Sequence, residues 1–177
     1  MTVQPFVYES AQAASEACAR EIIELLGGAL ASQPRVSTTV SGGNARKAMF
    51  AQMAKANFDC SNVHLFWVDE RLVPTTDSQS NYKLPSANVH SVPHFDMVHR
   101  GMGADAHTAS LFPGEPSIAG AVSVEKFQQW RITLLPAVLE AARQTLVLVA
   151  GEGKAEPLKA VLNERYDPKK YPAQIST

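Results

Sequence analysis

Short apolar segments alternate with helical segments along this chain, and this alternation constrains the fold more than any other feature. The segments expected to form strands are 35–40, 63–68, 95–98, 145–149 and, as a further candidate, 131–134. Apolar residues at helical spacing mark 11–30, 45–55, 135–143 and 154–163. Strands connected by helices form a mostly parallel sheet with helices on both faces. The sequence therefore predicts a doubly wound α/β fold in a single domain, residues 1–177.

Polar or glycine-rich clusters follow the predicted strands at the points where they end. In such sheets, ligands bind outside the carboxyl ends of the strands. Four clusters stand at those ends, and their shared placement predicts a site there: Ser41-Gly42-Gly43-Asn44, Asp69-Glu70-Arg71, the stretch 103–110, and Gly151-Glu152-Gly153-Lys154.

The glycine-flanked turn 101–114 contains the strongest candidate for acid–base chemistry. His107 stands two positions after Asp105, so the carboxylate could orient an imidazole that acts as a general base. A lone histidine on a loop is more often a solvated or capping residue. Ser110 has no glycine-elbow context, which argues against a serine nucleophile.

The other clusters offer groups that bind anions. Ser41 to Asn44 opens a helix, where free backbone N–H groups and the helix dipole suit a phosphate. A tight turn without a ligand explains this cluster equally well. The cluster is not a Walker phosphate-binding motif, because the Gly-Lys-Ser/Thr ending of that motif is absent. Arg71 and Lys154 follow predicted strand ends, and two cations beside a glycine turn favour a phosphorylated ligand.

Charge and composition exclude several classes of function. The formal net charge is -1 at pH 7, so no electrostatic argument favours nucleic acid or an anionic membrane as a partner. Cys18 and Cys60 lie far apart in the sequence. Both are therefore expected to be ordinary thiols in a reduced compartment. No apolar run reaches membrane length and no secretory signal begins the sequence, which predicts a cytoplasmic location. No metal site is expected, because metal-ligand spacing is absent among His64, His90, His94 and His99.

Taken together, these motifs resemble those of the 6-phosphogluconolactonases. The resemblance covers nearly the whole chain in order, and its most specific part is the run His107-Thr-Ala-Ser-Leu-Phe-Pro-Gly114. The related glucosamine-6-phosphate deaminases share the fold, but in them this turn continues with Asn-Glu-Pro. The other matching segments are Val40-Ser-Gly-Gly43, Val68-Asp-Glu-Arg71 with Val73-Pro74, Ser80-Asn-Tyr82, Arg131-Ile-Thr133 and Gly151-Glu-Gly-Lys154.

The resemblance implies a Rossmann-like fold of the sugar-phosphate isomerase type and hydrolysis of 6-phospho-D-glucono-1,5-lactone, without a metal or an organic cofactor. His107 would activate the attacking water, and Asp105 would orient His107 or stabilise its protonated form. Small sugar-phosphate lactones would be the partners of a monomer or small homo-oligomer. The implied substrate-binding residues are Ser41, Gly42, Gly43, Arg71 and Lys154 for the phosphate, Arg131 for the sugar acid or phosphate, Asn44 for the substrate or its phosphate, and Asn81 in the pocket wall.

The chain departs from the family pattern at several positions. Asn44 replaces a serine, Ala106 replaces a glycine, and His99-Arg100 stands where the family has aliphatic residues. If residue 106 needs a positive φ, alanine costs on the order of 1 kcal/mol or more. The chain also looks shortened near 84–94, after Gly114 and at the C-terminus.

These departures leave alternatives to an active lactonase. One is an impaired lactonase-like protein, and another is a hexosamine-6-phosphate deaminase of the same fold. A third is a sugar-phosphate-binding module, although the chain has no room for a DNA-binding helix-turn-helix.

Overall fold

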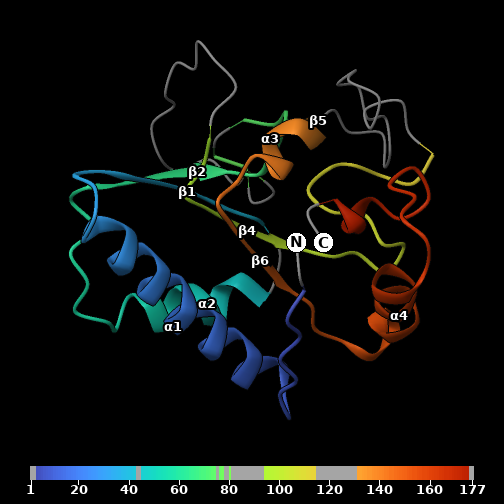
Figure 1. The fold of residues 1–177 in the computed structure, drawn as a ribbon, viewed down its shortest axis with the longest axis horizontal. Helices are drawn as coiled ribbons and strands as arrows, with labels where there is room; N and C mark the ends of the chain where they lie inside the picture. Colours follow the sequence, from blue (N-terminus) through green and yellow to red (C-terminus); the bar gives the residue numbers. More distant parts are fainter. Residues whose placement is uncertain are drawn as a thin grey trace.

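A parallel sheet of four strands forms the centre of the part of the chain that the structure describes (Figure 1). The computed structural model describes residues 3–42, 45–74, 76–77, 80, 94–114 and 131–175. In chain order the elements are α1 (Ala11–Leu30), β1 (Val36–Val40), α2 (Ala45–Met53), β2 (Val63–Trp67), β3 (Asp69–Arg71), β4 (Met97–Gly101), β5 (Arg131–Thr133), α3 (Pro136–Glu140), β6 (Gln144–Leu148), the 3-10 helix η3 (Glu152–Lys154), α4 (Ala155–Asn163) and the 3-10 helix η4 (Pro172–Gln174).

The sheet has the strand order β2-β1-β4-β6, and every neighbouring pair is parallel. Figure 1 shows α1 and α2 on one face of the sheet and α3 on the other. Parallel neighbours require crossover connections, and among the described residues α2 lies between β1 and β2 and α3 between β4 and β6. The predicted doubly wound α/β fold is therefore confirmed.

Helix α1 anchors one face of the sheet. Its first turn is capped by Ser10, whose Oγ accepts a hydrogen bond of 3.1 Å from a backbone N–H three residues further on. Ile22 and Leu26 are buried against Val36 of β1 and Met97 of β4. Burial of each such aliphatic side chain contributes about 1.5–3 kcal/mol. The predicted helix has the same bounds in the structure.

The core on the opposite face joins the sheet to the turn that follows β4. Val68 and Val98 pack there with Leu139 of α3, and all three side chains are buried. Leu111, which belongs to the turn, and Ile175, near the C-terminus, are completely buried in the same cluster. The turn is thus attached to the sheet by apolar packing as well as by its backbone.

A second, two-stranded sheet corrects one expectation from the sequence. The cluster 69–71 does not simply follow a strand, because it forms β3 itself and pairs antiparallel with β5. Val68 joins the two sheets: its N–H donates to Val40 O at 3.1 Å, and its carbonyl oxygen accepts from Leu134 N at 2.9 Å. Segment 131–134 therefore contains a strand, but it lies outside the parallel sheet.

Strand β4 also differs from its predicted bounds. It runs from Met97 to Gly101 instead of 95–98, so its interior includes His99 and Arg100. Both side chains are buried, and burial lowers the pKa of His99 to about 4 and that of Arg100 to about 10. Of the segments that look shortened in sequence, 84–93 and 115–130 lie outside the described residues.

Candidate functional site at the carboxyl edge of the sheet

The carboxyl ends of three parallel strands meet at one edge, as the sequence predicts. A Cβ atom added to Gly101, the last residue of β4, would lie 3.7 Å from Ser41 Oγ and 3.7 Å from Leu148 O. Ser41 directly follows β1, and Leu148 ends β6. The backbones approach closely at this edge, and the Ser41 side chain is buried there.

The turn after β4, residues 102–114, folds back on itself and holds His107; we call it the histidine turn. Gly103 N donates to His107 O at 2.8 Å, and Ala106 N donates to Gly103 O at 3.1 Å. Thr108 Oγ1 donates to Gly101 O at 2.9 Å, which ties the turn to the end of β4. A Cβ at Gly103 would overlap the His107 ring. Glycine is therefore needed at this position because the ring lies directly against the backbone.

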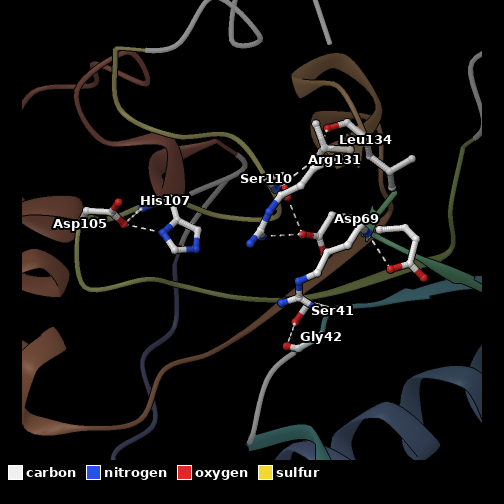
Figure 2. Close-up of polar contacts among 11 residues, drawn as sticks. Ser41, Gly42, Asp69, Asp105, His107, Ser110, Arg131 and Leu134 are labelled. Carbon is white, nitrogen blue, oxygen red and sulfur yellow. Dashed lines mark hydrogen bonds and ion pairs between the residues drawn. The ribbon is translucent and has the colours of Figure 1, made fainter. Parts of the chain in front are cut away.

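Asp105 and His107 form a hydrogen-bonded pair on this turn (Figure 2). Asp105 Oδ1 contacts His107 Nδ1 and also accepts a hydrogen bond of 3.2 Å from His107 N. The carboxylate thus fixes the ring orientation and favours the tautomer that has its proton on Nδ1. Nε2 is then the nitrogen that can accept a proton, and both side chains remain partly open to solvent.

Ala106, which replaces the glycine of the family pattern, has a positive φ. Its φ is 62°, in the left-handed region, and its side chain is 1% exposed. An L-residue there costs about 1–2 kcal/mol relative to glycine. Its methyl group packs against Met102, Val161 and Ala173, which offsets part of that cost. This packing therefore helps to accommodate alanine at a left-handed position.

Phe112 connects the histidine to a second group of polar residues. Its ring centroid lies 4.5 Å from that of His107, and the Arg131 Cζ atom lies 5.8 Å from the same ring. Arg131 Nη1 is 3.9 Å from Asp69 Oδ2, which also accepts a 2.6 Å hydrogen bond from Ser110 Oγ. Figure 2 shows Asp69 joined by dashed lines to Ser110 and to Arg131, on the side of the His107 ring away from Asp105.

Asp69, Ser110 and Phe112 were not among the residues predicted for the site. Asp69 belongs to a predicted strand-end cluster, and this placement was the available signal for it. The sequence excluded Ser110 only as a nucleophile, and the structure places its hydroxyl as a donor to Asp69. Nothing in the spacing of Phe112 indicates that its ring would contact both a histidine and an arginine.

Two arginines face each other across the small antiparallel sheet. Arg71 of β3 is directly opposite Arg131 of β5. Like charges at opposed positions destabilise a strand pair. Burial, followed by the positive charge of Arg71, lowers the pKa of Arg131, whereas the carboxylate of Asp69 acts in the opposite direction. A bound anion would relieve this repulsion, so the pair is suited to a phosphate or carboxylate.

The remaining predicted site residues either make few contacts with the other candidates or lie outside the described residues. Ser41 Oγ donates weakly to Gly42 O at 3.4 Å, and Ser41 N points to His99 Nδ1 at 3.5 Å. Lys154 ends η3, which follows β6, and among the described residues no ion pair joins it to the other candidates. Gly43, Asn44 and Asn81 lie outside the described residues.

The described ranges contain neither a cluster of metal ligands nor a membrane-spanning helix. No group of three or more His, Cys, Asp or Glu side chains is arranged there to hold a metal ion. None of the helices in those ranges is long and apolar enough to cross a membrane. The expectation of a metal-free site stays a prediction.

The fold and the site define a doubly wound α/β protein with a histidine–aspartate pair and two opposed arginines beyond one sheet edge. A family model described as glucosamine-6-phosphate isomerases/6-phosphogluconolactonase matches residues 9–91 and 83–177. The chain belongs to this family.

Individual relatives agree with the family model. The 6-phosphogluconolactonase of Haemophilus influenzae is 30% identical over 181 residues, covering 78% of this chain and 78% of the relative. That of Synechocystis sp. is 28% identical over 191 residues, covering 83% of this chain and 80% of the relative. The solved 6-phosphogluconolactonase of Trypanosoma brucei matches with a TM-score of 0.82 at 23% identity, covering 99% of this chain and 92% of the other. This structural match supports the fold.

Proposed function

We propose that this chain hydrolyses 6-phospho-D-glucono-1,5-lactone to 6-phosphogluconate. The observation that carries the proposal is the Asp105–His107 pair on a turn whose Phe112 also contacts Arg131. A proton acceptor with cationic groups nearby suits the hydrolysis of a phosphorylated lactone, which supports the proposal. Relatives named 6-phosphogluconolactonase, at 28–30% identity, support the same reaction.

In the proposed mechanism His107 acts first as a base and then as an acid. Its Nε2 takes a proton from water while the water oxygen bonds to the lactone carbonyl carbon. The ring C–O bond then breaks, and the departing ring oxygen receives the proton back from Nε2. Asp105 keeps the ring oriented and stabilises its protonated form. A general base of this kind contributes about 10²–10⁴ in rate.

The phosphate would lie against the cationic side of the site. Arg71 and Arg131 are opposed across β3 and β5, and an anion between them would offset their mutual repulsion. The hydroxyl of Ser41 and the backbone of Gly42 would complete the anion site from the end of β1. The roles of the remaining predicted residues are proposed from the family resemblance: Gly43, Asn44 and Lys154 at the phosphate and Asn81 in the pocket wall.

The test is lactone hydrolysis above the spontaneous rate, measured for the wild type, His107→Gln and His64→Gln. Glutamine retains much of the size of histidine but cannot serve as the base, so kcat of His107→Gln should fall about 10²–10⁴-fold. His64 is an exposed histidine on β2 and serves as the matched control, with unchanged kcat expected. Equal rates for wild type and His107→Gln would overturn the base assignment. Release of ammonia from glucosamine 6-phosphate, with no lactone hydrolysis, would indicate a deaminase instead.

Location and assembly also remain proposals. A cytoplasmic enzyme, present as a monomer or small homo-oligomer, fits the near-neutral formal charge of -1 and the two widely spaced cysteines. Nucleic acid and membranes are not expected as partners on the same grounds.

A further inference from the structure

A segment near the C-terminus contacts both sides of the histidine turn. Residues 167–175, which we call the C-terminal brace, follow α4 and include η4. Ala173 N donates a hydrogen bond of 2.9 Å to Ala106 O, and Gly114 N donates one of 2.9 Å to Lys169 O. One bond is therefore formed directly before His107, and the other at the far end of the turn.

The side chain of Gln174 holds the brace in its own shape. It is 2% exposed, its Oε1 accepts from Asp167 N at 2.7 Å, and its Nε2 donates to Val161 O at 3.3 Å and to Glu164 O at 3.2 Å. These bonds close the brace on itself and connect it to the end of α4. A buried amide that satisfies several backbone groups fixes one conformation of the segment.

Arg100 fastens the brace to the central sheet. Its side chain is fully buried, and Nη2 donates to Ile175 O. Its Nε and Nη1 atoms have no hydrogen-bond partner in the part of the chain that the structure describes. A buried cation with so few partners is costly to hold. An aliphatic residue at this position would avoid that cost, and the hydrogen bond to Ile175 O is the contact that the arginine adds.

The histidine turn contains a residue that needs such support. Ala106 adopts φ 62°, and its carbonyl oxygen accepts the hydrogen bond from the brace. Its methyl group packs against Ala173 of the brace and Val161 of α4. Without these contacts alanine would favour a negative φ, and the next residue, His107, would turn away from its present position.

We propose that the C-terminal brace is a positioning element for His107, and that Arg100 is the residue that fastens it to the sheet. The brace keeps Ala106 left-handed in a chain that lacks glycine there. The catalytic consequence rests on the proposed function of His107, whereas the coupling between the brace and the turn does not. Arg100 and Gln174 act through the turn and do not touch the reacting atoms.

The coupling is tested by hydrogen exchange, followed by mass spectrometry, in Arg100→Leu and Gln174→Leu. Loss of one hydrogen bond to a charged group corresponds to about tenfold faster exchange of the amides of residues 103–114. Arg143→Leu is the matched control, because Arg143 is an exposed arginine just before β6 that pairs with Asp96. Unchanged exchange of the turn in both test variants would overturn the proposal, whether or not the chain hydrolyses lactones.

Measuring kcat together with resistance to urea distinguishes a positioning role of Arg100 from a general loss of structure. In Arg100→Leu we expect kcat to fall about tenfold with KM nearly unchanged, while resistance to urea stays equal or increases because a buried charge is removed. Adding Ala106→Gly to Arg100→Leu should restore most of kcat, since glycine adopts a positive φ without strain. A kcat equal to that of the wild type in Arg100→Leu, or no rescue by Ala106→Gly, would contradict the positioning role. If the wild type were inactive but residues 103–114 exchanged faster in Arg100→Leu and Gln174→Leu, the proposed function would be refuted. The coupling between the C-terminal brace and the histidine turn would still be supported.

Discussion

Replacement of Gly103 by alanine should disable the histidine while leaving the fold in place. A Cβ at Gly103 would overlap the Cε1 and Nδ1 atoms of His107 and would lie 2.8 Å from Asp105 Oδ1. The backbone itself accepts alanine, because positive φ among the described glycines is confined to Gly114 and Gly151. The added methyl group therefore acts on the His107 ring and its carboxylate partner.

The expected loss of catalytic rate in Gly103→Ala follows from the distance that the His107 ring must move. Carbon atoms require about 3.5–4.0 Å between them, so the ring has to shift by about 1 Å or more. A misplacement of about 1 Å in a catalytic group costs about 10²-fold in rate, or about 2.7 kcal/mol in the activation barrier. Overpacking of this kind lowers the free energy of unfolding by about 1–3 kcal/mol. KM should change little, because Arg71 and Arg131 belong to the other sheet.

The assay compares steady-state lactone hydrolysis and urea unfolding of Gly103→Ala with those of Gly28→Ala. Gly28 lies in α1, and an added Cβ there meets no atom within 4 Å. Alanine at that helical position should raise stability by about 0.8–1 kcal/mol and leave kcat unchanged. A Gly103→Ala variant with the kcat of the wild type would refute the claim that the present His107 geometry is the catalytic one.

Two further predictions concern charge. Arg71→Ala should lower kcat/KM for the phosphorylated lactone about 10–100-fold, as expected for loss of a charge-assisted hydrogen bond, and leave unphosphorylated gluconolactone unaffected; equal losses on both substrates would contradict the phosphate role. Burial raises the pKa of Asp96, but hydrogen bonds from Ser37 and Gln33 and the charge of Arg143 together lower it below its usual value. This carboxylate therefore stabilises the fold above the unfolded-state pKa of about 4, and that contribution is lost as the pH falls through the lower folded-state pKa. Asp96→Asn should lower the free energy of unfolding by about 2 kcal/mol near neutral pH, with a gap that narrows below about pH 4; a gap independent of pH in urea titrations would exclude this linkage.

The sequence predicted those parts of the fold that have a long periodic signal. Helix α1 has its predicted bounds, because its apolar residues recur at helical spacing over 20 residues and Ser10 caps its first turn. The edge of the site was predicted because parallel strands bring their carboxyl ends together, and Ser41 and Gly101 meet there. The glycine usual at position 106 raised the question of a positive φ there, and Ala106 does adopt φ 62°.

Other features depend on contacts that a local pattern does not encode. Strands β3 and β5 have three residues each, too short for an alternation of period two to appear. The hydrogen bond from Ser110 to Asp69 joins residues 41 positions apart. The C-terminal brace contains Pro172 and no regular apolar spacing, so its contact with Ala106 follows from the three-dimensional packing alone.

The pairing of β3 with β5 also bears on the order in which the molecule folds and unfolds. The two strands are separated by about 60 residues, so their pairing closes a long loop at an entropic cost. Three residue pairs offset that cost, together with the Leu134 N–Val68 O and Ser110 Oγ–Asp69 Oδ2 hydrogen bonds, whereas β1–β2 and β4–β6 each have five residue pairs. The small sheet should therefore form late and open first, as a local event below the global unfolding transition. Because Arg71 and Arg131 belong to it, heating should abolish substrate binding before the parallel sheet melts.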